Sequence, residues 1–275
     1  MKVERSYGIL AREPSSDDHL AKLSEELGTR GFAVIENVLS ESEVARYNQM
    51  LDDVYQLQSD EIARLGHLRD INDEDIVRLP LAYNREFIKM AAAPAVIELA
   101  KREMGESLVL LMQNGVINRP DRLQFQTSWH RDLNYQHWVC SKMICMSALF
   151  CLEDFNPETG GTHFLPASHK FENFPSQNLA DKVAVAPLAK KGSVIVFNAM
   201  TFHRAGVNTS SVIRRAVNHV IGVPILGQQI DVPSMLKQAP EDPWIANYLG
   251  FRWNPAPSVH EWRQRKFAAA PKAPN

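Results

Sequence analysis

The sequence predicts a mainly β fold with flanking helices, and three observations lead to that prediction. From Leu108 onward the chain consists of short apolar and β-branched runs, which Pro, Gly, Asn and Asp separate. No helical period lies between these runs, which favours a sandwich or barrel over a doubly wound parallel sheet. Helical spacing is concentrated in roughly the first hundred residues. Together these features fit a double-sheet jelly roll with helices added to it.

The N-terminal part begins with the signals of a capped amphipathic helix. Ser15 and Ser16 are suitable N-cap residues, leucines follow at helical spacing, and Gly28 is a suitable end. The next run, GFAVIENVL from Gly31, is apolar and β-branched, so we predict a strand there.

Two more helices are predicted before the β-rich part. Ser40 and Glu43 form the S-x-x-E pattern of a capping box ahead of apolar residues at helical spacing. Pro94 suits the first turn of a further helix, which we expect to end near Gly105.

The β-rich part supplies seven predicted strands, and the segment after Ile225 returns to helix and loop. The strands are expected in the runs LVLLMQNGVIN, LQFQTSW, MICMSALFCL, THFLP, KVAVAPL, GSVIVFN and RAVNHVIGV. We therefore predict one domain over 1–275. It has a mostly helical part at 1–106 that packs on the barrel, a jelly-roll core at 107–225 and a helical and loop extension at 226–275.

Composition and charge exclude several classes of protein. Thirty Lys and Arg against 32 Asp and Glu give a net charge of −2, with no long run of either sign, so we expect no nucleic-acid partner. No stretch approaches the roughly 18 apolar residues of a membrane helix, and no signal-peptide pattern opens the chain. We expect a cytoplasmic monomer or homodimer without a membrane partner.

The cysteines indicate neither a disulfide framework nor a zinc site. Cys140, Cys145 and Cys151 are odd in number and lack paired C-x-x-C spacing. Because they stand among apolar residues, we expect reduced, buried and inert thiols.

The segment SWHRDLNYQHW contains the first candidate metal ligands. His130 and Asp132 are two positions apart, and side chains at i and i+2 of an extended strand project from the same face. With a distant second imidazole they would form a two-His-one-carboxylate site, which suits iron(II) and leaves coordination positions open. A lone His-x-Asp pair is a weak signal, because such pairs are common on protein surfaces.

A second segment, GSVIVFNAMTFHRAGVNTSSVIRRAV, supplies the residues that such a site lacks. His203 follows a buried-type strand and is the candidate third ligand. Arg214 begins the next strand, where its planar guanidinium can bind the far end of a dicarboxylate. The alternatives are a histidine that bonds the backbone of a turn, and a solvated cation at Arg214 or Arg215.

These two segments and ETGGTHFLPASHK together resemble the phytanoyl-CoA dioxygenase family, a branch of the iron(II)- and 2-oxoglutarate-dependent oxygenases. The resemblance covers most of the chain and implies a double-stranded β-helix, a cupin-like jelly roll with helices packed outside. Carried over by position, it implies that His130, Asp132 and His203 bind iron. It also implies that Arg214 pairs with the distal carboxylate of 2-oxoglutarate.

The activity that the resemblance implies is that of a dioxygenase. Such an enzyme uses O2 and 2-oxoglutarate to hydroxylate or otherwise oxidise a C–H bond of a small organic metabolite, and it releases succinate and CO2. The β-rich part shows no Lys/Arg cluster suited to nucleotide phosphates, so we expect a free small-molecule substrate rather than a CoA thioester.

Four further residues are weaker candidates for this site. The resemblance implies a contact of Thr162 with 2-oxoglutarate, since related branches place a threonine just after the Gly160–Gly161 turn, and Gln126 lies near the first ligand. Tyr135 follows the metal pair and Asn218 shares strand parity with Arg214, so both are candidates to line the substrate pocket.

One departure from the family pattern concerns a turn. Many members have Pro-Gly-Ser-His where this chain has Pro-Ala-Ser-His, so we expect Ala167 to lie in a turn without positive φ. In this pattern His163 and His169 have structural roles and are not expected to bind the metal.

Two other functions stay open on the same fold. One is a cupin-like zinc or manganese isomerase or epimerase that needs no 2-oxoglutarate, against which Arg214 argues. The other is a non-catalytic binding protein.

Overall fold

A computed structural model describes residues 3–6, 9–12, 18–63, 73–120, 122–133 and 138–269. In chain order the elements are β1 (Val3–Ser6), β2 (Ile9–Arg12), α1 (His19–Arg30), β3 (Phe32–Ile35), α2 (Glu41–Ala63), β4 (Ile76–Arg78), α3 (Pro80–Tyr83), α4 (Glu86–Ala91), α5 (Pro94–Met104), β5 (Val109–Asn118), η2 (Phe125–Thr127), β6 (Cys145–Cys151), β7 (His163–Phe164), η3 (Ser168–Lys170), α6 (Gln177–Val183), β8 (Val194–Asn198), β9 (His203–Arg204), β10 (Arg214–Gly222), α7 (Val232–Leu236), α8 (Pro243–Tyr248) and α9 (Val259–Ala269).

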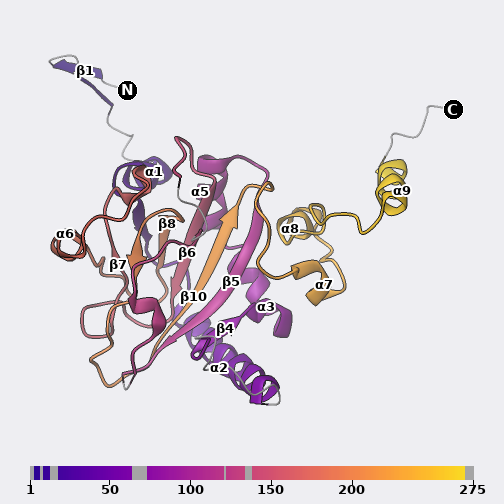
Figure 1. The fold of residues 1–275 in the computed structure, drawn as a ribbon, viewed down its shortest axis with the longest axis horizontal. Helices are drawn as coiled ribbons and strands as arrows, with labels where there is room; N and C mark the ends of the chain where they lie inside the picture. Colours follow the sequence, from indigo (N-terminus) through magenta and orange to yellow (C-terminus); the bar gives the residue numbers. More distant parts are fainter. Residues whose placement is uncertain are drawn as a thin grey trace.

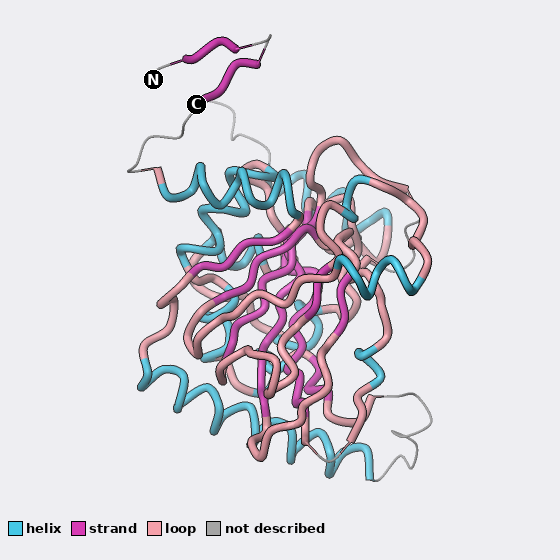
Figure 2. Tube along the Cα trace, turned by 90° about the vertical axis from the view of Figure 1, so that its left-hand side faces the viewer, coloured by secondary structure: helices cyan, strands magenta, loops and turns pink. Residues whose placement is uncertain are grey.

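The centre of the molecule is a six-stranded antiparallel sheet in the order β3-β8-β6-β10-β5-β4 (Figure 1). The short strands β7 and β9 pair separately and antiparallel. Figure 2 shows the strands running side by side through the middle, with helices toward the periphery. The predicted fold class, an antiparallel jelly roll with flanking helices, is confirmed.

Both faces of the large sheet are covered, which explains why its long strands are buried along most of their length. On β6, Met146, Ala148 and Phe150 belong to the main hydrophobic core, which the helices share. The alternate residues Leu149 and Cys151 pack into a second apolar cluster with Phe residues of β3, β7 and β8. The site described below lies on this second face.

The first helix begins and ends later than predicted. Its N-cap is Asp18, whose side chain accepts a hydrogen bond from a first-turn amide; Ser15 and Ser16 lie outside the described residues. Gly28 lies inside the helix, and Gly31 ends it in the left-handed conformation (φ 88°). Only a residue with positive φ at this position closes the last turn, so the second glycine and not the first is the cap.

The other two N-terminal helix signals are confirmed. The Ser40 backbone amide donates to Glu43 Oε2 (2.8 Å) and the Glu43 amide donates to Ser40 Oγ (3.3 Å), the reciprocal pair of a capping box. Helix α5 begins at Pro94, and Gly105 is its C-cap.

Two predicted strands are wrong and one is shorter than expected. The run LQFQTSW contains the 3-10 helix η2, where Thr127 Oγ1 bonds the Gln124 carbonyl (2.8 Å) and so favours a turn over a ladder. The run KVAVAPL forms only one isolated bridge, at Val185, because α6 extends into its first residues. In THFLP only His163–Phe164 is a strand.

Ala167 contradicts the expectation of a turn without positive φ, because its φ is 60°. Tertiary contacts impose this conformation. The Ala167 amide donates to the Arg30 carbonyl (2.8 Å), and Ser168 Oγ accepts from the Phe202 amide (2.8 Å). The left-handed turn therefore joins the end of α1 to the segment before β9.

Cys145 and Cys151 are free and buried as predicted, but Cys140 is exposed because it lies in the loop before β6. Within the described parts of the chain, every helix is too short or too polar to cross a lipid bilayer.

Candidate metal centre

Two histidines from distant parts of the chain are joined by their backbones. His130 forms an isolated antiparallel bridge with His203 of β9, and each amide donates to the other residue's carbonyl at 3.0 Å. Two residues further on, the Asp132 amide donates to the Ala199 carbonyl (3.1 Å). Main-chain hydrogen bonds thus hold the three candidate ligands in register.

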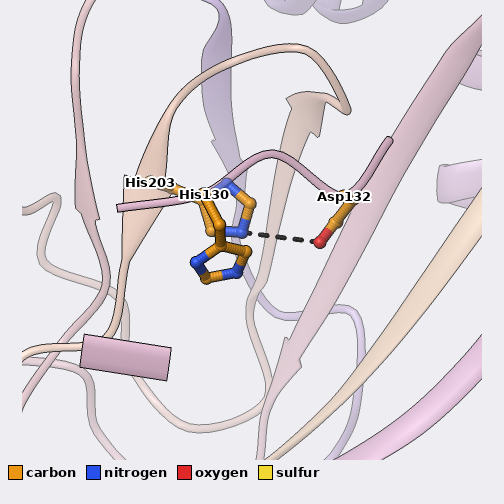
Figure 3. Close-up of side chains that lie close together, drawn as sticks. All are labelled: His130, Asp132 and His203. Atoms are coloured by element: carbon orange, nitrogen blue, oxygen red, sulfur yellow. Dashed lines mark ion pairs between the residues drawn. The ribbon is translucent and has the colours of Figure 1, made fainter. Parts of the chain in front are cut away.

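The three side chains converge on one point (Figure 3). His203 Nε2 lies 3.5 Å from Asp132 Oδ1, and the rings of His130 and His203 are 4.3 Å apart between centroids. One candidate ligand atom from each of the three residues lies within 4.8 Å of the others. Two imidazole nitrogens and one carboxylate oxygen at this spacing suit a transition-metal ion.

Each histidine is oriented by a carbonyl close to it in sequence. His130 Nδ1 lies 2.8 Å from the Ser128 carbonyl, and His203 Nδ1 lies 3.0 Å from the Thr201 carbonyl. A carbonyl oxygen only accepts hydrogen bonds, so each Nδ1 carries the proton and each Nε2 keeps its lone pair for a metal.

The protonation states also suit ligands. Burial, and next the electrostatic effect of His203, lower the pKa of His130 to about 4, which leaves the His130 imidazole neutral near pH 7. Burial alone would raise the pKa of Asp132. The two histidines and the hydroxyl of Ser147 outweigh that effect and hold the pKa of the carboxyl below its ordinary value.

Two side chains bind the other oxygen of Asp132. Ser147 Oγ on β6 donates a hydrogen bond to Asp132 Oδ2, and Asn218 Nδ2 on β10 donates to the same oxygen at 3.2 Å. Oδ1 remains on the side of His203.

Arg214 is buried in the same cavity without an ion-pair partner among the described residues. Its side chain lies over the Phe155 ring (4.5 Å), and Nη2 donates to the Gly160 carbonyl (3.0 Å). Nε is buried without a hydrogen-bond partner. Burial lowers the pKa of Arg214 to about 10, so the guanidinium still carries its charge near pH 7. A buried, charged group with a free donor is typical of an anion-binding position.

Two adjoining cavities meet at His130 and Asp132. The smaller, about 60 Å³, is lined by His130, Asp132, His203 and Arg214. The larger, about 420 Å³, also reaches His130 and Asp132. A β-bulge in β5 shapes its wall, because the register against β10 shifts there and both Leu111 and Met112 line the cavity.

The weaker candidates fall into two groups. Thr162, which is buried, and Asn218 line the smaller cavity, and Gln126 lines both cavities. Tyr135 lies outside the described residues, so its predicted substrate contact stays a prediction. Neither His163 nor His169 joins the three-residue cluster.

The residues present therefore fit an iron(II) ion together with a dicarboxylate. The two Nε2 atoms and Asp132 Oδ1 form a mixed nitrogen and oxygen donor set, and Arg214, whose Nε has no hydrogen-bond partner, lines the same cavity. A dicarboxylate could bind the metal with one end and the guanidinium with the other.

The sequence interpretation missed two residues of the site. Ser147 is the one hydroxyl in the apolar run MICMSALFCL, and that contrast was a usable signal. Arg131, between the first two ligands, is buried and donates to the carbonyls of Ser168 (3.1 Å) and Met200 (2.8 Å). These hydrogen bonds hold the ligand segment against the loops around His203. No local sequence pattern predicts them.

Comparisons with known proteins identify the family of this chain. The model of the phytanoyl-CoA dioxygenase (PhyH) family matches residues 28–216, which is more than half of the chain. An uncharacterized protein of Mycobacterium tuberculosis is 28% identical over 229 residues, covering 80% of this chain and 81% of the relative.

Two solved structures share the fold. EctD from S. alaskensis was solved with 2-oxoglutarate and 5-hydroxyectoine and has a TM-score of 0.61 at 18% sequence identity. The matched region covers 77% of this chain and 79% of the EctD chain. The epimerase SnoN was solved with Fe3+, alpha ketoglutarate and nogalamycin RO and has a TM-score of 0.57 at 18% sequence identity. The matched region covers 81% of this chain and 91% of the SnoN chain.

Proposed function

The chain belongs to the phytanoyl-CoA dioxygenase family of iron- and 2-oxoglutarate-dependent oxygenases, and from that premise we propose that it oxidises a C–H bond of a small organic metabolite. The proposed reaction is a hydroxylation that consumes O2 and 2-oxoglutarate and releases succinate and CO2.

The observation that carries this proposal is the position of Arg214. A buried guanidinium with an unpartnered Nε lines the cavity that contains His130, Asp132 and His203. A metal protein without a carboxylate co-substrate has no evident use for such a group, because burying an unpaired charge is unfavourable. This argues against the isomerase that needs no 2-oxoglutarate.

Each residue has a proposed task at the loaded site. His130 Nε2, His203 Nε2 and Asp132 Oδ1 would hold iron(II) and leave three coordination positions open. Arg214 would bind the distal carboxylate of 2-oxoglutarate, with Thr162 and Gln126 lining its position. When bound, iron with 2-oxoglutarate and O2 supplies the oxidising power, and the protein supplies the binding and orientation.

The larger cavity is the proposed substrate site. It adjoins His130 and Asp132, and it combines an apolar wall at Leu111 and Met112 with the polar side chains of Asn114 and Gln228. A volume of about 420 Å³ suits a small organic molecule. Side chains of this wall would hold one C–H bond near the metal and keep water away from it.

An anaerobic titration tests the metal and co-substrate. The metal-free protein receives iron(II) and then 2-oxoglutarate, and the weak visible band of a chelated keto acid should appear in proportion to protein. A screen of small metabolites should then find compounds that raise succinate release above the uncoupled rate. A protein that binds iron(II) but shows no such band with 2-oxoglutarate would contradict the proposal.

A second candidate is epimerisation at a C–H carbon with the same metal and co-substrate and with two further electrons from an external reductant, since the structure of SnoN, described as an epimerase, covers most of this chain. Product mass separates the two reactions. Hydroxylation adds one oxygen atom to the substrate, whereas epimerisation leaves its mass unchanged.

A further inference from the structure

We propose that Ser147 and Asn218 are positioning residues of the metal centre, which occupy Asp132 Oδ2 so that the carboxylate offers only Oδ1 to the ion. The inference rests on the proposed function in one respect, namely that the three-residue cluster holds a divalent metal. It does not depend on the reaction or on the substrate.

The large sheet places the two donors side by side. Asn218 on β10 is paired with Leu149 of β6, while Ser147 of β6 is paired with Val220 of β10. Ser147 and Asn218 are therefore diagonal neighbours on one face of adjacent antiparallel strands, within reach of a shared partner. That partner is the carboxylate of Asp132, which the loop after His130 brings over this face.

The hydrogen-bond roles follow from chemistry. A carboxylate oxygen such as Asp132 Oδ2 accepts hydrogen bonds and does not donate them. The Asn218 atom that faces Oδ2 must then be the NH2 group. Asn218 Oδ1 is left buried without a hydrogen-bond partner. The side-chain amide therefore donates a hydrogen bond to Asp132 while its own carbonyl oxygen accepts none, which is energetically unfavourable for Asn218.

Two donors on Oδ2 leave the aspartate with one oxygen for a metal. Oδ1 lies 3.5 Å from His203 Nε2, on the side of the histidines, while Oδ2 faces the sheet. A carboxylate that bound through both oxygens would occupy an extra coordination position. Holding Oδ2 keeps that position open for a co-substrate, which a facial two-His-one-carboxylate site requires.

Cobalt(II) titration of the metal-free full chain tests the inference without any turnover. Ser147→Ala and Asn218→Leu should each weaken cobalt affinity about 10- to 100-fold, the usual effect of losing an outer-shell partner. Ser147→Thr keeps the hydroxyl and should bind within about threefold of wild type. The matched control is Ser193→Ala, because Ser193 is buried and lines neither cavity.

The Asp132→Ala background separates positioning from general damage. If Ser147 acts through Asp132, adding Ser147→Ala to Asp132→Ala should change the remaining cobalt affinity less than about twofold. Equal losses in both backgrounds would overturn the inference, as would wild-type affinity in the single variants. Ser147→Ala, the smaller change, carries the test alone if Asn218→Leu does not fold. A wild-type protein that binds no cobalt would instead overturn the metal centre itself and with it the proposed function.

Discussion

His130 and His203 exchange both backbone hydrogen bonds of an antiparallel pair, at 3.0 Å in each direction, although a large part of the chain separates them. Their imidazoles are therefore neighbours because their main chains are paired. The side chains are not needed to hold the two segments together, so removing one imidazole should leave the fold intact.

His203→Ala should strongly weaken metal binding while the protein stays folded. Loss of one of three ligands should weaken cobalt or iron(II) affinity by more than about 100-fold, since even an outer-shell loss reaches that size. The thermal midpoint of the metal-free protein should change little, because the bridge to His130 is made by backbone atoms. Retained affinity in the variant would remove His203 from the site.

Arg214→Met should raise the 2-oxoglutarate requirement and leave metal affinity unchanged. A hydrogen bond to a charged group contributes about 1.5–3 kcal/mol, which corresponds to a rise of about 10- to 150-fold in the KM for 2-oxoglutarate. Steady-state succinate release as a function of 2-oxoglutarate measures it.

Arg215→Met is the matched control for Arg214→Met. Arg215 points to the opposite face of β10, where it is ion-paired with Asp52 (2.7 Å) and Glu153 (3.2 Å). Its loss should lower the free energy of unfolding but leave the KM for 2-oxoglutarate as it was. The reverse pattern would make Arg215 the anchor.

Local signals explain what the sequence predicts correctly. The helix that starts at Pro94 and the strands that contain Ser147 and Arg214 follow from caps and apolar runs, which act within a few residues. The His130 and Asp132 pair was visible in the same way, as an i, i+2 spacing.

Contacts between distant segments explain what the sequence does not predict. The orientation of Asp132 depends on Ser147 and Asn218, which belong to two other strands. The left-handed turn at Ala167 depends on the Arg30 carbonyl at the end of α1. Arg131 binds loop carbonyls far along the chain. The number of residues between these contact partners follows no regular spacing, so the periodicity of the sequence does not predict the contacts.

Ala167→Gly should stabilise the protein. Alanine at φ 60° carries a penalty of about 1–2 kcal/mol relative to ordinary backbone, whereas glycine adopts this conformation freely and loses about 0.5–1 kcal/mol of chain entropy. We expect the free energy of unfolding in urea to rise by about 0.5–1 kcal/mol. Ala21→Gly in α1 is the control and should lower it by about 1 kcal/mol. A lower free energy of unfolding in Ala167→Gly would mean that the contacts of the alanine Cβ stabilise the fold by more than its backbone strain destabilises it.

His219 is a fully buried histidine on the helix-covered face of β10, where its Nε2 lies 2.8 Å from Gln113 Nε2. That contact requires Nε2 to accept, so the ring is neutral. Burial lowers the pKa of His219 to about 3 from the ordinary value of 6.5.

His219 should therefore make the folded state sensitive to mild acid. Below its ordinary pKa the unfolded chain takes up a proton that the folded chain does not bind, so this stability is complete above pH 6.5 and is lost as the pH falls toward 3. Between about pH 7 and pH 5 the free energy of unfolding of wild type should fall about 2 kcal/mol further than that of His219→Gln. Urea unfolding of both proteins at several pH values measures the difference. The contributions of all other titrating groups are the same in the two proteins and cancel in that difference. Parallel curves for the two proteins would show that His219 is protonated in the fold.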